Sequence, residues 1–242
     1  MQVIYNITEM WEKINYSNKK VNIGGGFINY YNMVLEYINT IGKGVPIFIN
    51  EIEEYIIDIQ MEMNDRKVYN NVKAILHRMN NEGLLEKAYS GIYYMPVENI
   101  FGKMAIGNRD IIHYKYITDK KGNIKGYITG AKLFNEARLT TQVPNVIDIV
   151  SNECKNYNKY NNPNLNVVIR KPKIKITNDN YKYLQLFDLI ENKDKIEIEV
   201  ENSDELIYRF IKANNLDFEK IIKYAMDTKS RNVINKILTL AR

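Results

Sequence analysis

Apolar residues recur at helical spacing in two segments of the first quarter of the chain. The first segment covers residues 30–41 and is followed by Gly42 and Gly44, which favour the end of a helix. The second segment covers Ile49–Ile59, after Pro46, and its polar positions are mainly acidic. The pattern predicts two successive helices.

A third helical pattern follows directly. Asn64 or Asp65 can cap its first turn, and Gly83 stands where a helix commonly ends in a left-handed residue. The apolar positions form a single stripe: Val68, Val72, Ile75, Leu76 and Met79. The opposite face and its flank are basic and amide-bearing, and they carry Arg66, Lys67, Asn70, Lys73 and His77.

Two short strand patterns, Leu84–Ala88 and Ile92–Met95, follow the third helix. The turn residues 89–91 between them are a hairpin signal. Three helices and then a two-stranded hairpin is the order of a winged helix-turn-helix, whose third helix enters the major groove of DNA while the wing reaches the backbone or the minor groove. We therefore expect residues 27–97 to form such a domain.

The pattern changes after Pro96. It predicts a small β-α-β unit from the strand Ile124–Ile128, the helix Ala131–Arg138 and the strand Val146–Val150. Further elements are expected as follows: a loop at 156–166, strands at 165–170, 174–177 and 196–200, an element of either type at 183–190, and helices at 204–214, 217–226 and 231–240. The predicted fold class is α+β, with residues 98–242 forming an α+β domain that ends in helices.

Positive charge is concentrated in the middle of the chain. The net charge is +5, but residues 1–65 carry 4 basic and 9 acidic side chains, residues 66–103 carry 6 and 3, and residues 104–190 carry 14 and 7. A nucleic-acid surface is expected in this basic stretch. The alternative is that lysine is simply frequent on a solvated surface.

Composition narrows the class of protein. With 242 residues, of which 45% are hydrophobic, the chain can bury one large core or two small ones. Cys154 cannot form an internal disulfide, and together with His77 and His113 it gives too few ligands for a zinc site. We expect a non-enzymatic protein without metal or cofactor. Neither a membrane span nor a signal peptide is predicted, which favours the cytoplasm.

The residue types on the third helix and the wing suit DNA. Arginine pairs with guanine and asparagine with adenine, while lysine and tyrosine hold phosphates. The expected DNA contacts are Arg66, Lys67, Asn70, Lys73 and His77 on the helix and Lys87 and Tyr89 in the wing. In the second domain, contacts to the operator backbone or to an acidic partner are expected from Arg170, Lys171, Lys173 and Lys175. The alternative is a solvated helix face in a protein-binding module.

Residues 90–96 read SGIYYMP, and residues 126–145 contain the strings GYITGAKLFN and LTTQVPN. These segments resemble the wing end and the second-domain signature of AbiEi-like antitoxin transcriptional regulators, and the likeness covers about residues 28–240. The chain departs from the pattern at Arg138, where a glycine is expected, and at residues 1–26, an N-terminal extension without a counterpart.

The resemblance implies a winged helix that represses its own operon and a second domain needed to neutralise a nucleotidyltransferase-like toxin. The expected partners are double-stranded operator DNA with inverted repeats, bound as a homodimer, and a cognate toxin. Gly24–Gly26 lack the surroundings of a phosphate loop, which favours the antitoxin half of such a pair.

Two other functions remain open. One is a replication or mobilisation protein of a plasmid or mobile element, which could use the same winged helix. The other is a metal-dependent nuclease built on Glu197, Glu199 and Glu201, although alternating Glu and Ile is the ordinary pattern of a half-buried strand.

Overall fold

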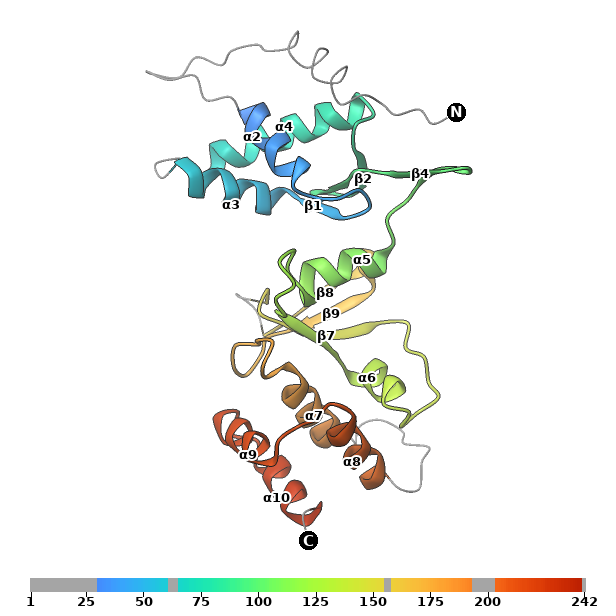
Figure 1. Ribbon diagram of the computed structural model, residues 1–242, viewed down its shortest axis with the longest axis vertical. Helices are drawn as coiled ribbons and strands as arrows, with labels where there is room; N and C mark the ends of the chain where they lie inside the picture. The colour runs from blue at the N-terminus through green and yellow to red at the C-terminus, as the bar shows by residue number, and fades with distance from the viewer. Residues whose placement is uncertain (1–29, 61–64, 155–157, 193–202, 241–242) are drawn as a thin grey trace. The chain divides into compact units, whose positions relative to one another are not determined.

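The computed structural model describes residues 30–60, 65–154, 158–192 and 203–240, and the chain divides into two compact units at Ile106/Gly107 (Figure 1). The sequence placed this boundary between residues 97 and 98. The difference is a hairpin of β4 (Val97–Asn99) and β5 (Gly102–Met104). It belongs to the first unit, where Lys103 Nζ lies 3.0 Å from the Glu86 carboxylate and 3.4 Å from the Gly83 carbonyl oxygen.

Helices and a three-stranded antiparallel sheet make up the first unit. The elements are α2 (Tyr30–Asn39), β1 (Pro46–Phe48), α3 (Ile49–Gln60), α4 (Asp65–Asn81), β2 (Glu86–Tyr89) and β3 (Ile92–Tyr94), with the sheet order β1-β3-β2. The three helices and the hairpin β2–β3 confirm the predictions, and Gly83 ends α4 with φ +75°. Strand β1 was not predicted, because three residues are too few to show an alternating pattern.

The second unit combines a four-stranded sheet with helices. Its strands are β6 (Gly126–Thr129), β7 (Ile147–Ser151), β8 (Lys159–Asn162) and β9 (Val167–Arg170). Its helices are α5 (Asn108–Ile112), continued by the π-helical turn His113–Ile117, α6 (Gly130–Glu136), α7 (Tyr181–Asn192), α8 (Ser203–Ala213), α9 (Phe218–Asp227) and α10 (Arg231–Leu240). The sheet order is β6-β7-β9-β8, in which only β7 and β9 run parallel. The mixed α and β class predicted from the sequence is confirmed.

Three details of the second unit differ from the predictions. The strands β6 and β7 of the expected β-α-β unit pair directly and antiparallel. Residues 174–177 are not a strand, because the Asn152 side-chain amide both donates to the Ile176 carbonyl and accepts from its N–H, at 2.9 and 3.0 Å. These are the two bonds that a neighbouring strand would supply. Strand β8 occupies part of the asparagine-rich stretch predicted to be a loop.

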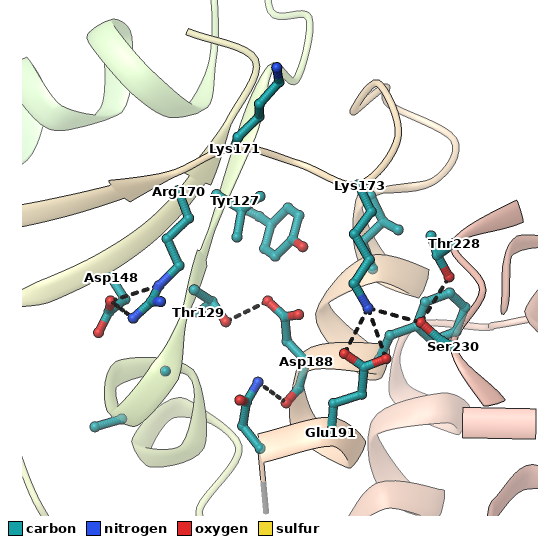
Figure 2. A pocket seen from close by; sticks show the side chains of 16 residues that line it. Tyr127, Thr129, Asp148, Arg170, Lys171, Lys173, Asp188, Glu191, Thr228 and Ser230 are labelled. Carbon is teal, nitrogen blue, oxygen red and sulfur yellow. Dashed lines mark hydrogen bonds and ion pairs between the residues drawn. The ribbon is translucent and has the colours of Figure 1, made fainter. Parts of the chain in front are cut away.

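Helix α7 is the centre of the second unit. It packs against β6, α6, α8, α9 and α10, so apolar residues occur on all sides of the helix. The helical period of apolar positions is therefore hidden, and for this reason the sequence pattern does not distinguish a helix from a strand at residues 183–190. The Thr129 hydroxyl donates to Asp188 at 2.5 Å, joining β6 to α7 (Figure 2). On α10 the inward residues are Val233 and Ile237, whereas Leu238, predicted to face inward, is 55% exposed.

Several predictions concern positions outside the described residues. They are the extension 1–26 with Gly24–Gly26, the strand 196–200 together with Glu197, Glu199 and Glu201, and Asn64 as a helix cap.

Arg138 adopts φ +60° in the turn that ends α6. Its N–H donates to the Asn135 carbonyl at 3.0 Å and the Leu139 N–H donates to the Phe134 carbonyl at 2.9 Å, a Schellman arrangement in which Arg138 holds the left-handed position. The resemblance described above predicts a glycine at this position, and a left-handed backbone is a conformation that favours glycine.

Arg138→Gly is expected to stabilise the second unit by about 1 kcal/mol, because glycine adopts a left-handed backbone without the steric cost that a Cβ imposes. Thermal unfolding of the full chain measures the effect. Arg138→Ala is the matched control, since it removes the side chain and keeps the Cβ, and it should leave the stability near that of the wild type. An alanine variant as stable as the glycine variant contradicts the explanation.

Candidate nucleic-acid interface and a polar pocket

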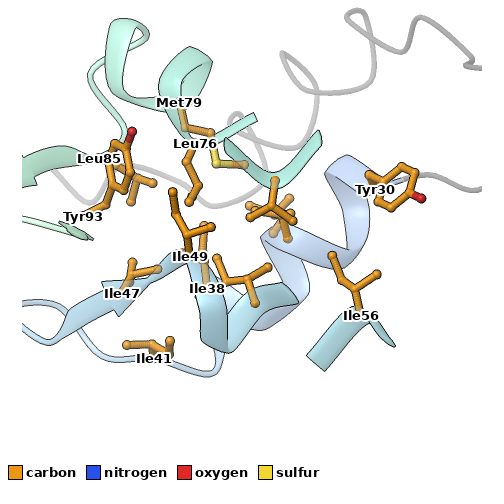
Figure 3. Close-up of a cluster of buried hydrophobic side chains, with 14 of the residues drawn as sticks. Tyr30, Ile38, Ile41, Ile47, Ile49, Ile56, Leu76, Met79, Leu85 and Tyr93 are labelled. Atoms are coloured by element: carbon orange, nitrogen blue, oxygen red, sulfur yellow. The ribbon is translucent and has the colours of Figure 1, made fainter. Parts of the chain in front are cut away.

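Helix α4 is fixed in its orientation by a stripe of buried residues. Val68, Val72 and Leu76 are fully buried and Met79 nearly so, and they pack against α2 and α3. Figure 3 shows Leu76 and Met79 pointing into the cluster that also holds Ile38. Because the buried stripe is well packed, the opposite face of α4 must lie on the surface of the first unit.

The predicted contact residues of α4 share this exposed face. Arg66, Lys67, Asn70, Lys73 and His77 are all exposed. Four of them follow one another at intervals of three or four residues, which aligns them along the helix. Neither Lys67 nor Lys73 forms an ion pair with a carboxylate within the described part of the chain, so both charges are available to a partner. Arg78, by contrast, pairs with Glu82 at 4.0 Å and covers the Tyr31 ring.

The hairpin β2–β3 adds two further predicted contacts to the same unit. Lys87 is exposed and Tyr89 is half-buried beside the turn Ser90–Gly91. The Gly91 carbonyl accepts from the Ile49 N–H at 3.2 Å, which holds the turn against the start of α3. The hairpin is therefore short and firmly attached.

The four basic residues predicted in the second unit do not form one patch of unpaired charge. Arg170 Nη2 lies 2.7 Å from Asp148 Oδ1, and Lys173 Nζ lies 2.9 Å from Glu191 and 3.1 Å from Ser230. Among the described residues, Lys171 and Lys175 have no carboxylate within ion-pair distance, and both are exposed. Ion pairing makes the other two weaker candidates for phosphate contact than the sequence indicated.

These ion pairs line a pocket of about 560 Å³, which sequence reasoning missed. The pocket lies between the sheet, α7 and the turn that joins α9 to α10 (Figure 2). Its polar lining consists of Tyr127, Thr129, Asp148, Arg170, Lys171, Lys173, Asp188, Glu191, Asn192, Thr228 and Ser230. Such partners could not be found from spacing, because Thr129 and Asp188, or Lys173 and Ser230, are far apart in the sequence.

Asp188 is the most perturbed acid of this pocket. Burial raises its pKa to about 6, because a carboxylate inside the protein loses its hydration; the Thr129 hydrogen bond opposes this shift, and the nearby charge of Glu191 adds to it. The folded state therefore holds a proton on Asp188 at a pH where the unfolded chain does not.

The pH dependence of stability follows from this shift. The folded-state pKa of Asp188 is raised above the ordinary value of 3.8. Protonation of Asp188 should therefore increase the free energy of unfolding by about 2 kcal/mol as the pH falls from 7 to 4.5. Asp188→Asn keeps an acceptor for Thr129 and should remove this component. Urea unfolding at both pH values measures it as the difference between wild type and variant. Identical pH profiles for the two proteins contradict the assignment.

Two hydrogen bonds of the string LTTQVPN are local to its own backbone and the neighbouring helix. Thr140 is buried, its hydroxyl accepts from the Gln142 N–H at 3.2 Å, and its carbonyl accepts from the Asn135 side chain. This matches the local role that Thr and Gln commonly have beside a strand. Val143, in contrast, is 77% exposed.

Neither a metal cluster nor a membrane-spanning helix occurs in the described ranges. No group of three or more His, Cys, Asp and Glu residues there could hold a metal ion, and no helix there is long and apolar enough to cross a membrane. Cys154 is buried and forms no disulfide, and burial raises the pKa of its thiol, which disfavours the reactive thiolate. No protein-family model matches the chain, and none of the curated proteins compared with it matches either.

Proposed function

We propose that the first unit is a winged helix-turn-helix that binds double-stranded DNA. Its element order, α2-β1-α3-α4-β2-β3, and the antiparallel sheet β1-β3-β2 support the assignment, since α4 then takes the place of the recognition helix and β2–β3 that of the wing. The observation that carries the proposal is the exposed face of α4. Arginine, asparagine and lysine side chains lie in line along this face, while the opposite face packs in the core.

The residues of this face have distinct roles in the proposal. Arg66 and Asn70 lie in the first turns of α4, where a recognition helix meets base edges, and they read guanine and adenine. Lys67, Lys73 and His77 contact phosphates, and Lys87 and Tyr89 do so from the wing. In the second unit, Lys171 and Lys175 remain as contacts to the DNA backbone or to an acidic partner.

We further propose that the chain is an AbiEi-like regulator, located in the cytoplasm, that represses its own operon and counteracts a nucleotidyltransferase-like toxin. The left-handed backbone of Arg138 supports this, because the family pattern has glycine at that position. Two glycines of the string GYITGAKLFN also have a structural reason. A Cβ at Gly126 would clash with backbone atoms, and Gly130 has a positive φ. Two copies would occupy inverted repeats as a homodimer.

Gel shifts with DNA from upstream of the protein's own reading frame test the helix assignment. Arg66→Ala and Asn70→Ala are expected to lower the preference for this DNA over unrelated DNA about tenfold each, because each removes a base contact. Lys73→Ala should weaken binding to all DNA and reduce the slope of log affinity against log salt by about one.

Lys173→Ala is the matched control. Its ammonium group is already held by Glu191 and Ser230, so its loss should leave DNA affinity almost unchanged. Unchanged preference in both Arg66→Ala and Asn70→Ala would exclude α4 as the reading element.

A further inference from the structure

The hairpin of β4 and β5 ends in a pair of large apolar side chains. Ile100 is 92% exposed and Phe101 is 90% exposed, more than any other large apolar residue in the described ranges. They form the two-residue turn between the paired residues Asn99 and Gly102. Exposed apolar side chains of this size commonly mark contact with a partner.

Local contacts shape the turn, and one lysine links the hairpin to the rest of the first unit. The Asn99 side-chain oxygen accepts from the Phe101 N–H at 2.8 Å, and Gly102 has the positive φ that so tight a turn requires. At the base of the hairpin, Lys103 binds both Glu86 and the Gly83 carbonyl, directly after α4. The hairpin that carries the two apolar side chains is thus linked to the residues that directly follow the proposed recognition helix.

The size of the apolar tip decides which partner fits. Two side chains of this kind offer roughly 400 Å² of surface, about half of the ~800 Å² that each partner contributes to a stable protein interface. The next cross-strand pairs, Asn99 with Gly102 and Glu98 with Lys103, are polar and separate the tip from the exposed apolar pair Val97 and Met104 at the base of the hairpin. A wedge into the minor groove of DNA needs only one or two such side chains, and phenylalanine and isoleucine are among those used.

We infer that Ile100 and Phe101 insert between base pairs from the minor groove and kink the DNA that α4 holds. The inference rests on the proposed DNA binding by α4. Insertion removes both side chains from water and partly unstacks one base step, so the duplex bends toward the major groove. The hairpin β4–β5 is then a second wing that acts on the shape of the DNA rather than on its base edges.

The experiment uses the full chain and duplexes from upstream of its own reading frame, with 2-aminopurine placed at successive positions. Binding of the wild-type protein should raise the 2-aminopurine fluorescence at one base step. It should also bend the duplex, and energy transfer between dyes on the two ends should report that the ends come closer. The double variant Ile100→Ser/Phe101→Ser should lose both signals and about tenfold in affinity. Val143→Ser, which removes an exposed apolar side chain elsewhere, should behave as wild type.

The outcomes separate this inference from the function on which it rests. If wild type and double variant bind and bend the duplex equally, the wedge is overturned and DNA binding stands. If wild type does not bind the DNA, both fail. A double variant that bends DNA normally, but loses self-association in light scattering or loses binding to phosphatidylglycerol vesicles, assigns the tip to a second copy or to a membrane and overturns the wedge.

Discussion

Gly126→Ala is expected to destabilise the second unit by about 3 kcal/mol or more, lowering its unfolding temperature by roughly 10 °C. A Cβ at Gly126 would lie 2.0 Å from the Tyr116 carbonyl oxygen and 2.8 Å from that of Val150. Both obstacles are backbone atoms, so a side-chain rotation cannot relieve the clash. The Tyr116 carbonyl also accepts from the Ser151 hydroxyl at 2.7 Å, a buried bond that any shift of the chain would break.

Gly42→Ala provides the matched control. Its added Cβ meets no atom within 4 Å and its φ is not positive, so its stability should remain within about 0.5 kcal/mol of the wild type. Scanning calorimetry of both variants measures the difference. A Gly126→Ala protein that unfolds within about 2 °C of the wild type contradicts the close approach of the π-helical turn to β6.

Reversing two charges on α4 should have the largest effect on DNA binding. Lys67→Glu/Lys73→Glu is expected to weaken affinity roughly 100-fold near 100 mM salt, because two phosphate contacts become repulsive and fewer counterions are released. Both residues are exposed and carry no carboxylate partner in the described part of the chain, so the fold should be retained. Fluorescence anisotropy with a labelled duplex measures the loss.

The control for this variant is Lys220→Glu/Lys223→Glu. It makes the same change of charge on the exposed side of α9 in the second unit. Equal losses in the two double variants would mean that overall charge, and not the α4 face, governs binding.

The first unit could be predicted closely from the sequence because its signals are local. The stripe from Val68 to Met79 has a single period, and Gly83 marks the end of α4 at the position where the structure shows a left-handed residue. The polar face opposite that stripe then follows from helix geometry alone. Strand β1 escaped detection because its three residues show no alternating pattern and its pairing with β3 is a long-range contact.

The second unit could be predicted less well because its structure depends on contacts between distant residues. Helix α7 is surrounded by other elements, so its residues lack the alternation on which prediction relies. Residues 174–177 look like a strand, yet one asparagine side chain supplies their bonds. The pocket around Asp188 joins residues from β6, β7, β9, α7 and the turn after α9, and no spacing in the sequence brings these together.

The most direct test of the central proposal is an anisotropy titration of the wild-type chain at 50 and 200 mM salt. It compares a duplex from upstream of the protein's own reading frame with a shuffled duplex of the same composition. The winged-helix proposal predicts at least about 100-fold tighter binding to the upstream duplex, with an affinity for both that falls steeply as salt rises. Equal and salt-independent affinity for the two duplexes, or no binding at 50 mM salt, would contradict it.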